Sequence, residues 1–217
     1  DLFEWRGASG SVPARYQLAW TDRDGIECSA YDPYCFPPQL GDLDLHLFGE
    51  GRHLHAYRFL GAQLCEIDGI KGTRFAVWAP GAERISVVGD WNHWDGRFHP
   101  MRARGGSGVW ELFIPGVGAH AYYKFEIRNR ETGSVQLKTD PYGQAFELRP
   151  GTASVTQHTD SYSWNDQQWM QTRAGRSWLH APLSIYEVHL GSWQRDRQGQ
   201  FLNYRELAEW LVNYVKE

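Results

Sequence analysis

The stretch Ile85-Ser86-Val87-Val88-Gly89-Asp90-Trp91-Asn92-His93-Trp94-Asp95 carries the two features that decide how this chain is expected to fold and act. Its first part alternates apolar and polar side chains, which is typical of a β-strand that buries one face. It then turns at Gly89 and places Trp91 and Trp94 three residues apart among polar side chains. Loops are normally covered by small polar residues, so two indoles in one loop predict either a plug at the edge of a core or a flat apolar surface for a ligand.

The β pattern continues on both sides of this stretch. Apolar side chains alternate with others at 73–77, 110–114 and 123–127, and Gly, Pro, Asn and Asp separate these runs. We assign residues 63–160 to an antiparallel β-sandwich in which each strand buries one face. Trp78 and Trp110 are expected in its core. Gly105–Gly108 lacks the context of a phosphate loop and is expected to form a hairpin turn.

Residues 1–62 are predicted to contain the later strands of a first, partial β-sandwich, then a helix and a connector. A strand-like run at 15–20 begins this region, and residues 52–72 show no sustained period. Two short matches indicate a duplicated fold: Tyr16-Gln17-Leu18 resembles Tyr123-Lys124-Phe125 at an offset of 107, and Asp32-Pro33-Tyr34 resembles Asp140-Pro141-Tyr142 at an offset of 108.

The leucines at positions 40, 43 and 47 have helical spacing, although those at 43, 45 and 47 also fit a strand. Glycines at 49 and 51 favour the helix, because glycine commonly follows a helix end. Further along, residues 161–182 are polar with scattered tryptophans and are predicted to be a linker. In 183–217 a β-rich run, a polar loop and an amphipathic helical run from Tyr204 to Val215 form the opening unit of a βα domain.

Composition excludes several classes of partner. The net charge is −4 and there is no basic block, so nucleic acid is not expected. No apolar run approaches the roughly 20 residues that span a bilayer, so no membrane contact is expected. Three cysteines without a Cys-x-x-Cys pair predict neither a disulfide framework nor a zinc site, and we expect them reduced in the cytoplasm. The 11 Trp and 11 Tyr suit a ligand with flat C–H faces edged by hydroxyls. The chain starts at Asp1 and stops just after a helical run, so we expect a piece of a longer protein.

Four segments resemble a known family. Gly72–Pro80, Gly89–Trp94, Trp110–Gly116 and Lys138–Tyr142 are similar to carbohydrate-binding module family 48 of bacterial 1,4-α-glucan (glycogen) branching enzymes. Ser184–Trp193 resembles the first strand of their glycoside hydrolase family 13 barrel. The resemblance covers nearly the whole chain. It implies a mainly β fold, with tandem immunoglobulin-like β-sandwiches, the first partial, followed by the first βα unit of a truncated (β/α)8 barrel.

The family's reaction cuts an α-1,4 glucan chain and rejoins it through an α-1,6 bond. This needs a carboxylate nucleophile and a carboxylic acid, which the family places on middle barrel strands beyond residue 217. The resemblance therefore implies no catalytic residue in this chain, no metal or cofactor, α-glucan (glycogen or malto-oligosaccharide) as partner, and packing of the module on the barrel. The alternatives are a related debranching or trehalose-forming hydrolase and a non-catalytic glycogen-binding scaffold. The barrel-like segment argues against the scaffold.

The candidate glucan-binding residues are Trp94, Lys124, Trp91 and Asn92. Strand alternation sends Lys124 to solvent, and relatives contact glucan at the positions that match Trp94 and Lys124. Trp91 is the more natural core plug, while Asn92 is of the type that orients a sugar through its hydroxyls. The second stacking ring of the family would fall near Val135–Leu137, where no aromatic residue is present.

Other polar residues are assigned structural roles. Glu187 and His189 are expected to hold strand and loop together rather than to transfer protons. His53 and His55 lack a third ligand at a suitable spacing, so a metal site is not expected. Asp42 and Asp44 are expected on a solvated face.

Overall fold

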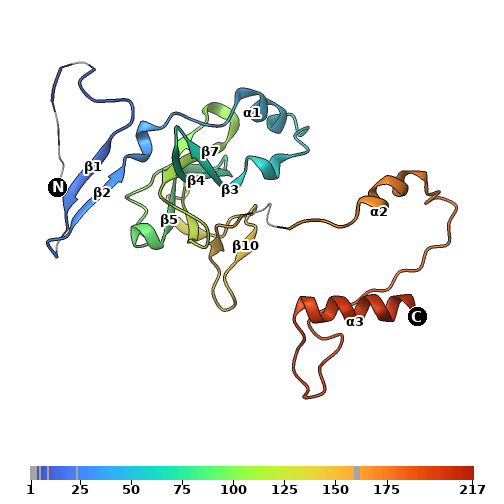
Figure 1. Ribbon diagram of the computed structural model, residues 1–217. Coiled ribbons are helices and arrows are strands. Elements are labelled where there is room, and N and C mark those ends of the chain that lie inside the picture. The colour runs from blue at the N-terminus through green and yellow to red at the C-terminus, as the bar shows by residue number, and fades with distance from the viewer. Residues whose placement is uncertain (1–3, 5, 9, 23, 159–161) are drawn as a thin grey trace. The chain divides into compact units, whose positions relative to one another are not determined.

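The structure is a computed structural model that describes residues 4, 6–8, 10–22, 24–158 and 162–217 (Figure 1). The chain divides into two compact units, Asp1–Ser163 and Trp164–Glu217. The first unit contains an N-terminal hairpin, a short helix and a β-sandwich, and the second contains two helices. Each unit is described by itself below.

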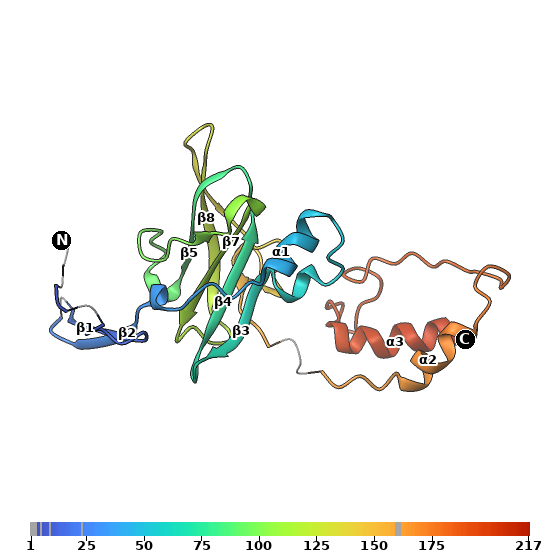
Figure 2. The ribbon, with the colours of Figure 1, turned by 90° about the horizontal axis from the view of Figure 1, so that it is seen from above.

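Two antiparallel sheets form the sandwich, and Figure 2 shows them as layers. One sheet has the order β3-β4-β7-β6, with strands Gly61–Ile67, Ile70–Trp78, Val109–Pro115 and Arg102–Ala103. The other has the order β10-β11-β8-β5, with strands Ala145–Phe146, Ser154–Val155, Tyr122–Asn129 and Ala82–Gly89, and β9 (Val135–Lys138) also pairs with β8. The predicted antiparallel sandwich is confirmed.

The core lies between these sheets, where the predicted alternation places it. The side chains of Phe75, Ile85, Leu112 and Phe125 are almost completely buried and belong to one cluster. Burying each such side chain contributes about 1.5–3 kcal/mol to stability. Gly105–Ser107 forms a short 3-10 turn between β6 and β7, as the predicted hairpin turn requires.

The expectation that each strand buries only one face is wrong for β7. Glu111 is only 2% exposed and Phe113 is also buried, although both side chains point away from the core. The connector between hairpin and sandwich covers them. The ring of Phe36 packs 4.8 Å from that of Phe113, and the Glu111 carboxylate accepts the backbone N–H groups of Gln39 and Leu40.

Three further expectations need correction. Trp78 is not a core residue: it is 52% exposed at the end of β4, and its ring meets Phe48 edge-on. Residues 52–72 are not a plain connector but contain a 3-10 turn (Ala56–Arg58), all of β3 and the start of β4. Residues 162–182 are not only a linker, since they include α2 (Gln167–Thr172) and a 3-10 turn (Arg173–Gly175); residue 161 lies outside the described residues.

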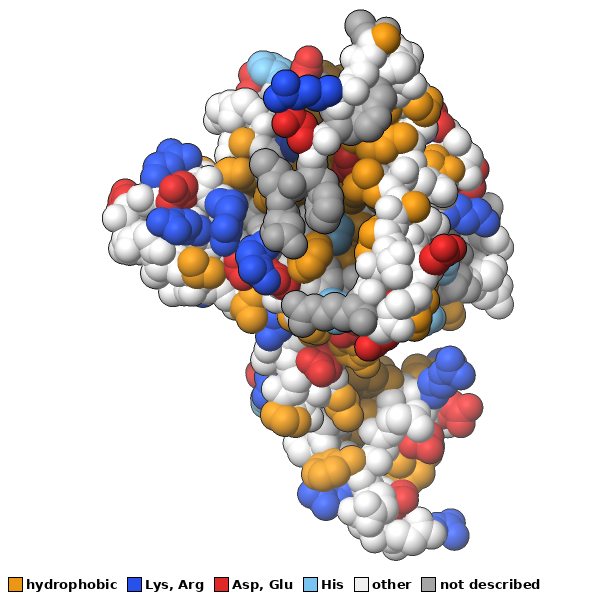
Figure 3. Space-filling view, turned by 90° about the vertical axis from the view of Figure 1, so that its left-hand side faces the viewer, with side chains coloured by type: hydrophobic (Ala, Val, Ile, Leu, Met, Phe, Trp, Pro, Cys, Tyr) orange, Lys and Arg blue, Asp and Glu red, His pale blue; other side chains and the backbone are white. Residues whose placement is uncertain are grey.

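The N-terminal region forms a hairpin of β1 (Gln17–Thr21) and β2 (Glu27–Tyr31). A 3-10 turn (Pro33–Cys35) and α1 (Asp42–Gly49) follow, which confirms the helix over the strand alternative. Apolar side chains of the hairpin, such as Leu18 and Trp20, are exposed, and Figure 3 shows hydrophobic groups between charged ones on this side of the protein.

The internal repeat recurs in the contacts of the structure. The Tyr16 hydroxyl donates to the Asp32 carboxylate, and the Tyr123 hydroxyl donates to the Asp140 carboxylate at 2.6 Å. Each aspartate also accepts the backbone N–H two residues later, at 2.8 Å in both cases. Matching residues therefore make matching bonds, while the assignment of 1–62 to a partial first sandwich stays a prediction.

In the second unit, α3 (Tyr204–Lys216) confirms the predicted helix, which begins at an Asn203–Glu206 capping box. The predicted strand at 183–189 is not formed. A barrel strand gains its hydrogen bonds from neighbouring strands, and the described part of this unit offers none. Its apolar side chains, including Leu183 and Ile185, are exposed. None of the helices in the described residues is both long and apolar enough to cross a membrane.

Candidate functional site

The candidate site lies on the outer face of the sheet that contains β5 and β8. Tyr123 and Phe125 are completely buried, so the alternation along β8 turns Tyr122 and Lys124 outward. Val88 is paired with Lys124 across the strands and shares this outer face. Val88 is nevertheless buried, because the loop that follows β5 folds back over this part of the sheet: Trp94 N–H donates to the Gly89 carbonyl, and Gly96 lies against the Glu126 carboxylate.

The turn after β5 directs its two indoles in different directions. Trp91 packs against the core and stacks on Phe75, with ring centroids 5.7 Å apart and an interplanar angle of 28°. Its ring covers the inner face of Gly89, where an added Cβ would lie 2.5 Å from the indole. The Nε1 of Trp91 is buried as well. The structure thus places Trp91 as a core plug rather than as an outward platform.

Asn92 holds the turn from inside. It is 3% exposed, and its Oδ1 accepts from the Gly89 N–H at 2.9 Å while its Nδ2 donates to the Val87 carbonyl at 2.9 Å. Both partners are backbone groups with fixed roles, so the orientation of the amide is determined. The expectation that Asn92 faces a sugar is therefore corrected, because its polar atoms are used within the protein.

This orientation also determines the state of His99. The Nδ2 of Asn92 lies 2.8 Å from the His99 Nδ1 and donates to it, so Nδ1 must be unprotonated and the imidazole neutral. Burial independently lowers the pKa of His99 to about 4. No periodic pattern in the sequence predicts this pair, since the two residues are separated by a loop.

Trp94 has an unusual backbone conformation. His93 and Trp94 have φ values of 54° and 60°, in the left-handed region that bulky residues rarely occupy. Each such residue costs on the order of 1–3 kcal/mol, and strain of this kind concentrates at functional sites. The indole Nε1 donates to the Asp90 carboxylate at 3.1 Å, which fixes the plane of the partly exposed ring. In the residue that follows Trp94, hydrogen bonds from Arg97 lower the pKa of the Asp95 carboxyl group to about 2.

Lys124 provides the polar centre of this face. Its Nζ donates to the Thr152 hydroxyl at 2.6 Å, and the Thr139 hydroxyl donates to the Thr152 carbonyl. Sequence reasoning missed Thr152, which lies in the loop before β11 and comes close to Lys124 only through the sheet order. Beyond them, β9 presents Val135 and Leu137, each 51% exposed. The face thus has one partly exposed indole, a lysine with a hydroxyl partner and an aliphatic edge.

The remaining polar candidates do not form a second site. His53 pairs with Asp44 at 2.8 Å, and His55 contacts the Tyr57 hydroxyl. Among the described residues no group of three or more His, Cys, Asp or Glu is arranged to hold a metal ion. Asp42 is fully exposed, and Glu187 and His189 are exposed in the second unit.

A comparison with family profiles matches residues 59–143 to "Carbohydrate-binding module 48 (Isoamylase N-terminal domain)". Residues 59–143 are thus similar to this family. The matched residues include β3 to β9, with both Trp94 and Lys124. The match begins shortly before β3.

Over its whole length the chain is similar to 1,4-alpha-glucan branching enzymes. It is 58% identical over 215 residues to that of Nitrosococcus oceani and 58% identical over 216 residues to that of Cellvibrio japonicus. These alignments cover 99% and 100% of this chain, which spans 29% of the length of each relative.

Among solved structures, a Klebsiella pneumoniae pullulanase complexed with maltotriose matches with a TM-score of 0.37 and 23% identity, over 46% of this chain and 9% of that chain. A type I pullulanase of Bacillus subtilis complexed with maltose matches with a TM-score of 0.38 and 28% identity, over 48% of this chain and 14% of that chain.

Proposed function

We propose that this chain is the glucan-positioning part of a 1,4-α-glucan branching enzyme and that its family 48 module binds α-glucan through Trp94, Lys124 and Thr152. The observation that carries this proposal is the outer face of β5 and β8, where Lys124 bonds to the Thr152 hydroxyl and the turn that follows β5 carries the oriented Trp94 indole. An indole covers the apolar side of a sugar ring, while ammonium and hydroxyl groups bond to its hydroxyls. The names of the whole-chain relatives support branching over the debranching, trehalose-forming and scaffold alternatives.

In the longer protein we expect glucan chains to be cut at α-1,4 bonds and rejoined at α-1,6 bonds. That chemistry requires two carboxyl groups about the scissile bond, which the family resemblance places on barrel strands beyond residue 217. The 217 residues alone should therefore leave the iodine-staining spectrum of amylose unchanged. Weak contacts on the module would raise the local concentration of glucan chains near a catalytic domain. We expect a cytoplasmic location for the protein.

The exposed apolar side chains of the second unit support a contact with that domain. Leu183, Ile185 and several residues of α3 are left uncovered in a segment that resembles the start of a barrel. We expect further barrel strands and helices to cover them.

Affinity electrophoresis in gels that contain glycogen tests the binding proposal. The intact chain should be retarded, and Trp94→Ala should lose most of this retardation, because the stacking surface is removed. Lys124→Ala should weaken it, while Lys71→Ala, which removes an exposed lysine from β4, should not. Trp20→Ala serves as the indole control, since this exposed ring lies on β1.

Circular dichroism must show that each variant is folded. If the intact chain migrates equally in gels with and without glycogen, the module does not bind glucan and serves only to pack. Equal retardation of Trp94→Ala and Trp20→Ala would place binding elsewhere on the chain.

A further inference from the structure

The proposed glucan site has an indole at only one end. The β8–β9 hairpin offers Val135 and Leu137 on the outer face, and their aliphatic side chains cannot stack on a sugar ring in the manner of an aromatic one. A single indole beside a lysine would hold one sugar unit and leave the direction of a longer chain undetermined. A longer chain would need a second ring on the same face as Lys124.

Tyr122 is located there. It precedes Lys124 by two residues on β8, so both side chains point to the same face, about 7 Å apart along the strand. Tyr122 is 40% exposed, in contrast to the completely buried Tyr123 beside it. It pairs with Val155 of β11.

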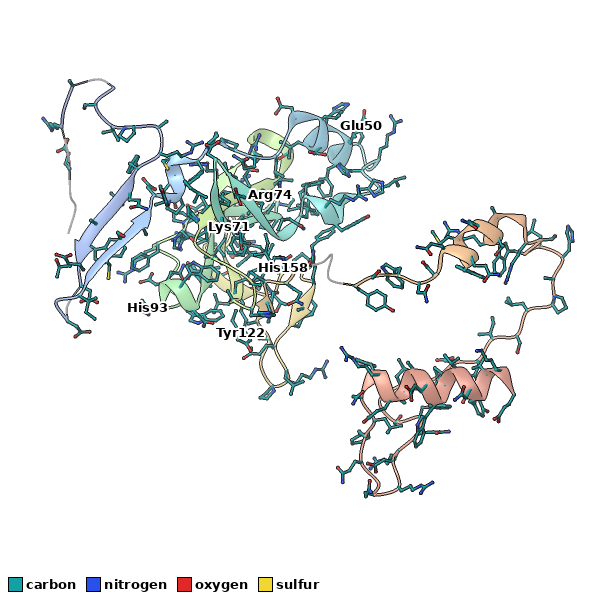
Figure 4. All side chains as sticks on the ribbon, in the orientation of Figure 1. Glu50, Lys71, Arg74, His93, Tyr122 and His158 are labelled. Atoms are coloured by element: carbon teal, nitrogen blue, oxygen red, sulfur yellow. The ribbon has the colours of Figure 1, made fainter. Side chains whose placement is uncertain are left out.

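The turn that carries Trp94 lies at the same end of the sheet. Gly89, which accepts the Trp94 N–H through its carbonyl, is paired with Tyr123. Figure 4 labels Tyr122 and His93, the neighbour of Trp94, and shows both at this end of the sandwich. Tyr122 on β8 and the turn that carries Trp94 after β5 thus lie at the same end of this sheet.

Resting on the proposed function, we propose that Tyr122 is the second stacking residue of this module and replaces the ring that the β8–β9 hairpin lacks. A malto-oligosaccharide would lie across Lys124 with one sugar on the Trp94 indole and a neighbouring sugar on the Tyr122 ring. The phenol is suited to this position because its face is apolar and its hydroxyl remains in water. The site would then favour chains long enough to reach both rings over single glucose units.

The test measures the dissociation constant of maltoheptaose by NMR titration of the intact chain and of variants. Tyr122→Ala should bind about three- to tenfold more weakly, and Tyr122→Phe should remain within about twofold of the original protein, because it keeps the ring. Tyr57→Ala, which removes an exposed tyrosine from the 3-10 turn before β3, is the matched control and should bind normally. Binding of glucose, which as a single unit cannot cover both rings, should depend less on Tyr122.

The outcomes separate the two proposals. If Trp94→Ala abolishes binding and Tyr122→Ala does not weaken it, Tyr122 is not part of the site and the proposed function stands. If the intact chain does not bind maltoheptaose, the proposed function itself fails. Equal weakening by Tyr122→Phe and Tyr122→Ala would contradict stacking in favour of a hydroxyl contact. Should Tyr122→Ala not fold, Tyr122→Leu against Tyr122→Phe makes the same comparison with an apolar side chain that lacks a ring.

Discussion

Replacing Asn92 by alanine should remove the internal support of the tryptophan turn. The amide bonds to the Gly89 N–H, the Val87 carbonyl and the His99 imidazole, at 2.9, 2.9 and 2.8 Å. The two backbone groups are buried, and leaving each of them without a partner would cost about 1–3 kcal/mol of stability. The partly buried imidazole adds about 1 kcal/mol, so we expect a loss of about 3–7 kcal/mol from the free energy of unfolding.

Urea unfolding followed by tryptophan fluorescence measures this loss. The matched control is Asn129→Ala, because Asn129 also accepts two backbone N–H groups, from Glu131 and Thr132, but in an exposed turn. That change should cost about 1 kcal/mol or less, since water replaces the lost partner. Glycogen retardation of folded Asn92→Ala should also fall, because the turn positions Trp94.

A small effect would refute this reasoning. If Asn92→Ala and Asn129→Ala differ by less than about 1 kcal/mol, the buried amide is not the support of the turn. If Asn92→Ala is strongly destabilised but, while folded, retains full glycogen retardation, then Trp94 either keeps its position without Asn92 or is not in the site.

Two other changes act on the same turn. His99 has a pKa of about 4 in the folded state and of about 6.5 in the unfolded state. Between these pH values the unfolded chain therefore binds more protons than the folded one. The free energy of unfolding should fall by up to about 3 kcal/mol as the pH drops from 6.5 to 4. Urea midpoints across this range should show a weaker slope for His99→Gln, and an unchanged slope would contradict the assignment. Gly89→Ala should lower the melting temperature markedly, because its Cβ would meet the Trp91 ring and the Tyr122 carbonyl oxygen, at a cost of about 1–3 kcal/mol. Gly81→Ala has open space at the same position, so equal melting temperatures for the two variants would show that the contact relaxes freely.

The strand pattern could be predicted because alternation is a local property. Phe75, Ile85 and Phe125 lie in the core where their spacing placed them, and the same alternation turned Lys124 outward. The buried outer face of β7 could not be predicted in this way. Its burial depends on a connector about 70 residues earlier, whose backbone N–H groups bond to Glu111. Nothing in the local pattern distinguishes Glu111 from an exposed strand residue.

The candidate site was predictable only in part for a similar reason. Sequence spacing suggested that one of the two neighbouring indoles is buried, and the structure identifies it as Trp91, through its stack on Phe75. By contrast, Asn92 was placed among ligand-facing residues because its amide suits sugar hydroxyls. In the structure this amide instead forms hydrogen bonds with the backbone of Gly89 and Val87, which the sequence pattern does not predict. Thr152 was missed because its approach to Lys124 depends on the order of strands in the sheet.

The internal repeat separates structural residues from ligand-facing ones. Both copies keep the tyrosine hydroxyl bonded to an aspartate carboxylate, and in each case this bond ties the start of a strand to a turn later in the chain. Burial, followed by the nearby Asp140 charge, raises the pKa of Tyr123, whereas the hydrogen bond to Asp32 is the main cause that raises the pKa of Tyr16 to about 12. The residue that follows each tyrosine differs: Lys124 in one copy and Gln17 in the other. The contact that supports the fold is thus repeated, while the cation that would orient a glucan is present in the second copy and absent at the matching position of the first.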